Sequence, residues 1–321
     1  MQNGLDEIFM YSLERLQEKN MVLFDVVGVG HVSLDNLGIV ESYPQLDQRV
    51  RMNDFLRQGG GEVATALVTL ARLGAKVSFV GKVGDDESGE FICKEFIQEG
   101  VDISQLVKEK GKMSLTAFCI IDRKSGKRTI FWYKNLSPLK LNEIDPNFLC
   151  QGKILHLDAH EPETAYDAAS YFRQHTEGRK IVLDIDDWDE QREKLVNLTD
   201  VLIGSETFAR NFHSSNPIFA LERIAALGPQ IVILTQGEKG CLGKVGNETF
   251  QVPGYHIDVI DTTGCGDVFH GAFVFGLLKD WDISYTARFA NAVAALKCTK
   301  LGGRTGIPNL AQTQEFMKKH Q

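Results

Sequence analysis

The sequence predicts an α/β protein with a doubly wound, mostly parallel β-sheet and a second, smaller β-sheet. Short apolar runs alternate with segments of helical period along much of the chain, which is typical of parallel strands joined by crossover helices. Two further segments alternate polar and apolar residues, and this period suits strands that leave one face open. The chain has 321 residues, 43% of them apolar, so it is long enough to bury a substantial core.

The first half of the chain contains the less regular elements. Apolar residues at helical spacing predict an amphipathic helix over 5–19. Two apolar runs that close on Gly74 and Gly100 predict helices ending at these glycines. The segment "RKSG" (123–126) is typical of a hairpin turn. In order, the predicted strands of this half span 22–30, 37–44, 49–58, 76–84, 114–122 and 128–134.

The second half follows a regular order of strand and helix, without internal repeats. Strands are predicted at 153–159, 180–185, 201–205 and 230–237, and helices between them at 163–176, 189–197 and 218–227. The strand at 230–237 is the last one expected before residue 261. An apolar helix is expected from about Asp267, and an alanine-rich helix over 286–298.

The half-exposed strands define a small β-sheet lid. They interrupt the regular order of the chain in two places, which suggests two excursions from one main domain. The predicted main α/β domain comprises 1–33, 58–113 and 135–321, and the predicted lid comprises 34–57 and 114–134.

Composition argues against several classes of protein. The formal net charge is −8, with lysine and arginine scattered rather than clustered, so nucleic acid is not an expected partner. The six cysteines form no C-x-x-C pair and no histidine stands at zinc-finger spacing, so neither a disulfide framework nor a structural metal is indicated, and a reducing cytoplasm is favoured. The N-terminus does not resemble a signal peptide, and the apolar run 271–278 is too short to span a bilayer. No membrane association is expected.

The segment "GVGHVS" after the first strand superficially resembles a dinucleotide fingerprint. The third glycine of that fingerprint is Ser33 here, and no helix-forming sequence follows, so a Rossmann site is not supported. Instead, Ser33 and Asp35 are expected where a strand ends at a ligand-binding cleft. Read alone, Asp35 is as well explained as an ordinary turn residue.

Three glycines precede the helix that ends at Gly74. Consecutive glycines cost conformational entropy, and close approach of a ligand to the backbone is one reason to keep them. A flexible loop is the alternative. A P-loop is excluded, because the sequence G-x-x-x-x-G-K-[ST] does not occur.

The segment "TQGEKGC" (235–241) ends the strand at 230–237. By itself it is an ordinary strand-to-turn sequence. Its expected place at the carboxyl edge of the sheet, directly before the segment from Asp261, favours a role in binding.

The segment "DTTGCGD" (261–267) carries the strongest chemical signal. Gly264, Cys265 and Gly266 are expected to form a turn whose N–H groups and helix dipole attract an anion. Asp267, in the first helical turn, is expected to be held ionised by the same dipole. A carboxylate beside an anion site suits a base that accepts a proton from an attacking hydroxyl, as in phosphoryl transfer. The alternative is an aspartate that only caps its own helix.

The segment 294–308 leaves two interpretations open. The alanines of the preceding helix and the glycine loop after it suit a surface for a flat base, or simply close helix packing and a turn.

Taken together, the motifs resemble those of the ribokinase/PfkB family of carbohydrate kinases. Two signatures carry the resemblance, "GGEVATALVTLARLGAKVSFVGKVGDDESG" and "DTTGCGDVFHGAF", and it covers nearly everything after residue 21. Within the family, the chain resembles most the ketohexokinase and sulfofructose kinase side. The resemblance implies a ribokinase-like fold and a kinase that uses ATP with Mg²⁺ and, in many members, K⁺.

The resemblance also implies roles for individual residues. Asp267 is implied as the catalytic base and Gly264, Cys265 and Gly266 as the anion hole for the transferred phosphoryl group. Positions that match the sugar site are Ser33, Asp35, Gly60, Gly61 and Thr65. Positions that match the nucleotide site are Thr235, Gly237 and Gly240 for the phosphates and Ala294 and Cys298 for the adenine. Positions that match the K⁺ site are Asp261, Thr263, Gly302 and Gly306.

Three residues depart from the family pattern. Thr65 replaces a usual asparagine, which shortens or removes a hydrogen bond to the substrate. Ser205 to Phe208 reads "SETF" where family members have an N-x-x-E motif linked to magnesium. Glu206 is therefore the only carboxylate expected to substitute for the glutamate of that motif. Gly306 replaces a side chain that often helps to hold K⁺.

The leading hypothesis is an ATP-dependent kinase that phosphorylates a primary hydroxyl of a ketose or related sugar. A nucleoside kinase and a catalytically inactive sugar or nucleotide sensor remain alternatives, whereas an oxidoreductase is disfavoured. A phosphorylated or sulfonated sugar requires a basic side chain, for which Arg49, Arg51, Arg123 and Arg128 of the lid are candidates. The resemblance further implies a homodimer formed through the lid.

Overall fold

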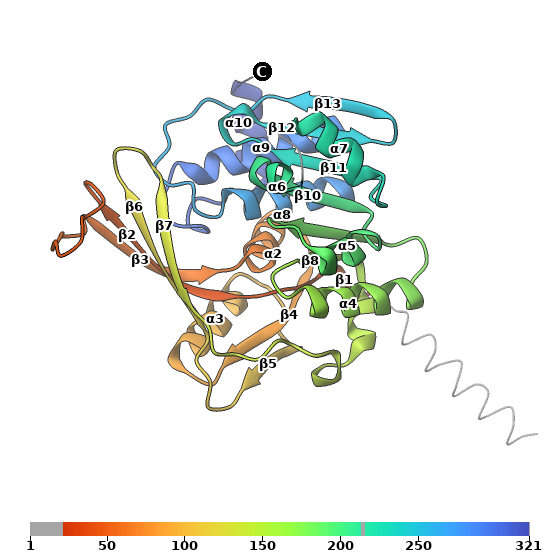
Figure 1. Ribbon diagram of the computed structural model, residues 1–321, viewed down its shortest axis with the longest axis horizontal. Coiled ribbons are helices and arrows are strands. Elements are labelled where there is room, and N and C mark those ends of the chain that lie inside the picture. Colours follow the sequence, from red (N-terminus) through yellow and green to blue (C-terminus); the bar gives the residue numbers. More distant parts are fainter. Residues whose placement is uncertain (1–21, 213–215, 321) are drawn as a thin grey trace, which may run out of the picture.

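The computed structural model describes residues 22–212 and 216–320, so the helix predicted at 5–19 lies outside the described residues. Two β-sheets are present, a larger one covered by helices on both faces and a smaller one that projects from it (Figure 1). The predicted fold class, a doubly wound mostly parallel sheet with a small second sheet, is confirmed.

Within the described residues the larger sheet has nine strands, in the order β13-β12-β11-β10-β9-β8-β1-β4-β5. Strands β11 through β5 in this order are parallel, and β12 and β13 add an antiparallel hairpin at one edge. The strands are β1 (Phe24–Val29), β4 (Val77–Gly84), β5 (Leu106–Glu109), β8 (Gly152–Asp158), β9 (Lys180–Ile185), β10 (Val201–Ser205), β11 (Ile231–Thr235), β12 (Cys241–Val245) and β13 (Glu248–Val252).

The prediction that the strand at 230–237 is the last one before residue 261 is wrong. Strands β12 and β13 follow it, and the predicted turn at 235–241 joins β11 to β12. These edge strands contain glycine, lysine and threonine and are only partly buried. They therefore lack the continuous apolar run that identifies a strand buried on both faces.

The helices form two layers with separate apolar cores. One core lies between the sheet and α2 (Glu62–Arg72), α3 (Glu87–Gln98), α8 (Cys265–Leu278), α9 (Ile283–Cys298) and α10 (Leu310–Lys319). The other lies under α4 (Pro162–His175), α5 (Glu190–Val196), α6 (Glu206–Asn211) and α7 (Pro217–Ala225). Short 3₁₀ segments span Leu141–Glu143, Pro146–Gln151 and Gly237–Lys239. The helices predicted at 163–176, 189–197 and 218–227 are confirmed to within two residues.

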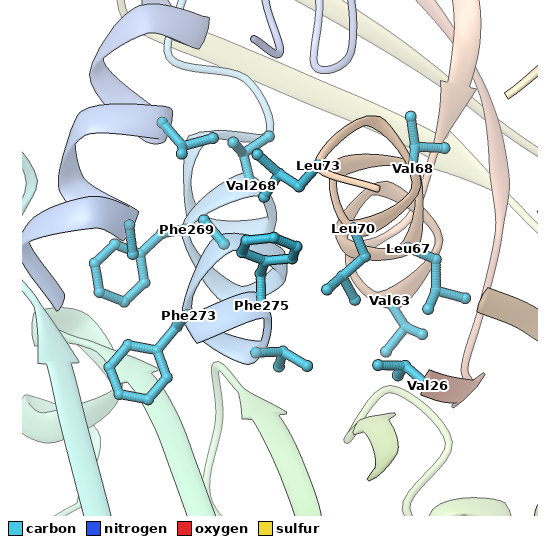
Figure 2. Close-up of a cluster of buried hydrophobic side chains, with 14 of the residues drawn as sticks. Val26, Val63, Leu67, Val68, Leu70, Leu73, Val268, Phe269, Phe273 and Phe275 are labelled. Carbon is cyan, nitrogen blue, oxygen red and sulfur yellow. The ribbon is translucent and has the colours of Figure 1, made fainter. Parts of the chain in front are cut away.

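Helix α8 is buried on all sides, unlike the amphipathic helices around it. Every residue from 268 to 277 is buried, and Figure 2 shows labelled side chains of α8 and α2 in one apolar cluster. The two helices approach closely at Gly271, where an added Cβ would lie 2.4 Å from the carbonyl oxygen of Ala66. This contact sets how closely α8 packs against α2.

The smaller sheet is mixed, in the order β3-β2-β6-β7. Its strands are β2 (Ser33–Val40), β3 (Asp54–Gly60), β6 (Leu115–Asp122) and β7 (Arg128–Tyr133). Strands β2 and β6 pair in parallel, and β6 and β7 form the hairpin predicted from "RKSG". Since strand side chains alternate between faces, this register divides the sheet into two different surfaces.

The inner face of the smaller sheet contacts the main body. Leu37, Ile39, Ala117, Cys119 and Ile121 form its small core, against which Leu301 packs from the chain that follows α9. The outer face, defined here by Phe55, Phe118, Phe131 and Tyr133, is open and about half exposed. Among the described residues, no helix is both long and apolar enough to cross a membrane.

The close contact of α8 with α2 predicts a specific loss of stability. Gly271→Ala places its methyl group against the backbone of Ala66, which cannot rotate away, so unfolding should become easier by about 1–3 kcal/mol. The measurement is urea denaturation followed by circular dichroism.

Gly266→Ala is the matched control in the same helix, because its Cβ would meet no atom within 4 Å. Alanine is the better helix former, so this variant should be about 0.5–1 kcal/mol more stable than the parent chain. Equal stability of the two variants would contradict the proposed packing contact.

Candidate active site

The amino end of α8 opens at the carboxyl edge of the larger sheet. Gly264 precedes the helix with a left-handed backbone (φ 71°), and an added Cβ would lie 2.9 Å from Cα of Gly303. The helix begins at Cys265, so the predicted start at Asp267 is two residues too late, and Cys265 and Gly266 belong to the first turn. The N–H of Cys265 donates to the carbonyl of Thr262 at 3.3 Å, whereas no described carbonyl accepts from the N–H of Gly266 or Asp267.

Asp267 is half-buried beside these N–H groups. Burial, followed by the negative charges of Glu62 and Asp186, raises the pKa of Asp267 well above its usual range, and Arg128 opposes this shift. The prediction that the helix dipole holds Asp267 ionised is therefore wrong in sign, because desolvation and two nearby carboxylates outweigh the dipole. A carboxylate with a raised pKa is a stronger base once ionised.

Four further carboxylates, here named the carboxylate cluster, lie near Asp267. They are Glu62 in the first turn of α2, Asp158 at the end of β8, and Asp184 and Asp186 at the end of β9. All four line a cleft of about 220 Å³. Burial and the charges of Asp186 and Glu62 raise the pKa of Asp184 well above its usual range. Burial opposes ionisation of Asp158 as well, but the charge of His31 lowers its pKa.

The sequence motifs did not identify the carboxylate cluster. Its signal was the position of acidic residues at the carboxyl ends of apolar parallel strands, which is where α/β sheets bind ligands. The role of Glu206 as the substitute carboxylate stays a prediction, while in the structure Glu62 and Asp186 exert the largest charge effects on Asp267. In "SETF", Ser205 caps α6 by accepting from the N–H of Phe208 at 3.1 Å, and Phe208 is buried in the core.

The predicted sugar-site residues are brought together beside α2. Ser33 Oγ donates to Asp35 Oδ1 at 2.6 Å, and both side chains are buried. A Cβ on Gly60 would lie 2.1 Å from Asp35 Oδ2, and one on Gly61 would lie 2.5 Å from the carbonyl of His31. The glycines are thus already required by contacts within the protein.

Thr65 contacts a buried arginine that the sequence motifs did not single out. Arg304 Nε donates to Thr65 Oγ1 at 3.3 Å, and its other nitrogens donate to Glu95 at 2.8 Å and to the carbonyl of Gly60 at 3.1 Å. The hydroxyl that replaces the usual asparagine amide is therefore used inside the protein. Arg304 lies between α2, α3 and the end of β3 and holds these elements in register.

His31 connects the sugar-site residues to the carboxylate cluster. Its Nδ1 lies 2.8 Å from Glu62 and 3.4 Å from Asp158, and its ring stacks on that of His160 with centroids 4.0 Å apart. Burial opposes protonation, but the charges of Glu62 and Asp158 raise the pKa of His31 well above its usual range. His31, Glu62 and His160 also offer three potential metal-ligand atoms within 4.8 Å of one another.

Arg128 is the arginine of the smaller sheet that reaches the amino end of α8. Its Nη1 donates to Thr262 Oγ1 at 3.2 Å, and its positive charge opposes the rise in the pKa of Asp267. Arg123 instead pairs with Glu41 at 2.7 Å, with both side chains 59% exposed. Arg49 and Arg51 are exposed.

The predicted nucleotide-site residues lie in two places. Thr235, Gly237 and Gly240 form the turn after β11, where Gly237 and Gly240 have positive φ. Ala294 and Cys298 lie on α9, and Ala294 is half-buried against the core. The Cys298 thiol, through its hydrogen bond to Cys265, lowers the pKa of Cys265 to about 6. The role of Ala294 and Cys298 as a surface for the adenine stays a prediction.

The residues predicted to hold K⁺ come together, but with a lysine among them. Asp261 Oδ1 accepts from Thr263 N–H at 2.8 Å and from its hydroxyl at 2.7 Å, and Asp261 Oδ2 accepts from Gly302 N–H at 2.8 Å. The ammonium of Lys297 donates to the carbonyls of Asp261, at 3.0 Å, and Thr263. A Cβ on Gly306 would lie 2.4 Å from the carbonyl of Lys297. These oxygens already have donors, so a K⁺ ion does not fit among them.

Comparison with known proteins places this geometry in a family. A model of the pfkB family carbohydrate kinases matches residues 24–310. The 5-dehydro-2-deoxygluconokinase of Geobacillus kaustophilus is 28% identical over 323 residues, which covers 92% of this chain and 94% of the relative. The ribokinase of Haemophilus influenzae is 25% identical over 299 residues, with 90% and 97% covered.

Solved structures agree with this match. The ribokinase of Thermotoga maritima superposes with a TM-score of 0.78 at 25% identity, covering 92% of this chain and 100% of that one. A ribokinase II candidate from E. coli, solved with ATP and Mg²⁺, has a TM-score of 0.81 at 24% identity, covering 93% and 100%. Because the family model spans nearly all of the described residues, and the fold is ribokinase-like, this chain belongs to the pfkB family of carbohydrate kinases and is a sugar kinase.

Proposed function

We propose that this kinase transfers the γ-phosphoryl group of ATP to a primary hydroxyl of a ketose or related carbohydrate. The observation that carries the proposal is Asp267, which stands in the first turn of a buried helix beside N–H groups that no described carbonyl uses. The relatives named as sugar kinases and the E. coli structure with ATP and Mg²⁺ support it. These relatives carry other names than ketohexokinase or sulfofructose kinase, so the position within the family stays a prediction.

In the proposed reaction, Asp267 removes the proton from the sugar hydroxyl. The freed oxygen bonds to the γ-phosphorus in line, the bond from that phosphorus to the β,γ-bridging oxygen breaks, and ADP leaves with the electron pair. The N–H groups of Gly266 and Asp267 and the dipole of α8 stabilise the negative charge on the transferred group, with Gly264 and Cys265 shaping the turn. Arg128 adds positive charge from the smaller sheet.

Magnesium fits the carboxylate cluster. The cluster offers hard oxygen donors, and burial together with neighbouring negative charges raises the pKa values of two of its members, Asp184 and Asp186, an effect that a divalent cation would offset. We propose that Glu62 and Asp186, rather than Glu206, hold the ion. When bound, Mg²⁺ neutralises charge on the β- and γ-phosphates.

The remaining assignments follow the same geometry. The sugar is proposed to bind near Ser33, Asp35, Gly60 and Gly61, under a smaller sheet that acts as a lid and excludes water. The nucleotide is proposed to lie along Thr235, Gly237 and Gly240, with its base near Ala294 and Cys298. The cysteines among the described residues are free, which supports a reducing compartment such as the cytoplasm.

We also propose a homodimer formed through the outer face of the smaller sheet. Its aromatic side chains are unusually exposed, with Phe118 at 52% and Phe131 at 54%, and they lie directly opposite each other on paired strands. An exposed aromatic patch of this kind is typical of an interface. A second copy of the same surface would cover it.

Asp267→Asn tests the proposed base. The amide cannot accept the proton, so kcat should fall by about 100- to 10,000-fold while ATP still binds. The measurement is ADP release over a panel that includes 5-dehydro-2-deoxygluconate, ribose, fructose and adenosine. Asp258→Asn, an exposed position in the preceding loop, is the control and should retain the parent rate.

A variant Asp267→Asn with most of the parent kcat would contradict the assigned role. Preferred turnover of adenosine would instead establish a nucleoside kinase. Ligand-induced stabilisation of the parent protein without turnover of any sugar or nucleoside would establish a sensor.

Phe118→Ser combined with Phe131→Ser tests the dimer. Loss of two aromatic contacts should weaken self-association by at least about 10-fold, as measured by light scattering over a protein dilution series. Ile97→Ser removes an equally exposed apolar side chain, 65% accessible, from α3 and should leave the mass unchanged. A monomeric parent protein, or a dimer unaffected by the double substitution, would overturn the proposal.

A further inference from the structure

The segment that leads into α8 is held by a positive charge of the chain itself. Lys297 lies in the last turn of α9 and has no exposed surface, and its ammonium donates to the carbonyls of Asp261 and Thr263. Thr263 directly precedes Gly264, the left-handed residue from which the helix starts, and Asp261 lies two residues before Thr263. The ammonium therefore fixes the backbone that aims the first N–H groups of α8.

A buried ammonium in this position requires a physical reason. Burying a charge is costly unless it is paired or hydrogen-bonded. Among the described residues no carboxylate lies within 4.0 Å of Lys297 Nζ, so the two backbone carbonyls are its partners. Both oxygens of the Asp261 carboxylate are used by Thr263 and Gly302, which keeps a negative charge nearby without a direct ion pair.

The backbone of Lys297 is fixed to the same loop as its ammonium. The N–H groups of Ile260, at 2.9 Å, and Asp261, at 3.2 Å, donate to the carbonyl of the next residue, Cys298. On the other side, Gly306 approaches the carbonyl of Lys297 so closely that no Cβ would fit there. The lysine thus cannot withdraw without loosening both segments that flank the amino end of α8.

The geometry points to Lys297 as a tethered replacement for a monovalent cation. Its ammonium takes up the carbonyl oxygens of Asp261 and Thr263, where a K⁺ ion was expected from the sequence, and it does so without an entropic cost of ion binding. Lys297 is then a positioning residue: it acts on the phosphoryl group only through the turn it holds. The consequence is a kinase whose rate does not depend on K⁺.

The first test uses the parent protein and asks whether K⁺ changes its rate or its melting temperature. The rate measurement rests on the proposed function. Rates and melting temperatures are compared in KCl and in choline chloride at equal ionic strength, so that general screening is matched. We expect kcat to agree within roughly twofold and the melting temperature to be the same in both salts. Strong activation by K⁺, or a melting temperature raised by K⁺ alone, would overturn the inference.

Two substitutions of Lys297 separate the charge from the packing of the side chain. In choline, Lys297→Ala should lower kcat by about 10- to 100-fold through misplacement of the turn, and KCl or methylammonium should restore much of this loss. Lys297→Met fills the same space without charge, so it should lose activity and gain nothing from K⁺. Lys300→Ala, at an exposed lysine three residues further on, should behave as the parent protein.

The melting temperatures provide a readout that needs no substrate. K⁺ should raise the melting temperature of Lys297→Ala but not that of Lys297→Met, Lys300→Ala or the parent protein. If Lys297→Ala keeps the parent rate in choline, or if K⁺ restores neither its rate nor its melting temperature, the inference is wrong. If no sugar is turned over, the melting temperatures alone still test the role of Lys297. If Lys297→Ala does not fold, the comparison of the parent protein in KCl and in choline chloride tests it.

Discussion

The contact between α2 and α8 is the constraint on which the candidate site depends. Gly271 lets α8 lie against the backbone of Ala66, and the apolar cluster on either side fills the space between the helices and the sheet. The first turn of α2 contributes Glu62, and the first turn of α8 contributes Asp267. Two helix starts more than 200 residues apart in the chain are thereby held over the same edge of the sheet.

The chemistry of the carboxyl edge of the larger sheet depends on the negative charges gathered there. Burial, together with the charges of neighbouring carboxylates from α2 and β9, raises the pKa values of Asp184, Asp186 and Asp267. Arg128, the dipole of α8 and its unused N–H groups supply only part of the opposing charge. Such a site favours a nucleotide that arrives with a divalent cation over a free anion, which agrees with a sugar kinase of the pfkB family.

Lys297 stabilises the segment that leads into α8. Asp261 organises its own turn through Thr263 and Gly302, and the lysine ammonium satisfies the carbonyls that face inward. The residues predicted for K⁺ therefore lie together, and we propose that the ammonium of Lys297 takes the place of the ion. The separation of 36 residues between Lys297 and Asp261 explains why no local motif revealed this.

The sequence by itself determined the α/β class, the alternation of strands and helices in the second half of the chain and the turn before α8, because these depend on local period, on glycines and on short motifs. It also placed Ser33, Asp35, Gly60 and Gly61 at one site and singled out Asp267. Only the tertiary structure decided that Glu62 and Asp186 lie near Asp267, that Arg304 donates to the hydroxyl of Thr65 and that Lys297 donates to the carbonyl of Asp261. Each of these contacts joins distant segments, and burial and charge at such a contact are properties of the folded chain rather than of any local pattern.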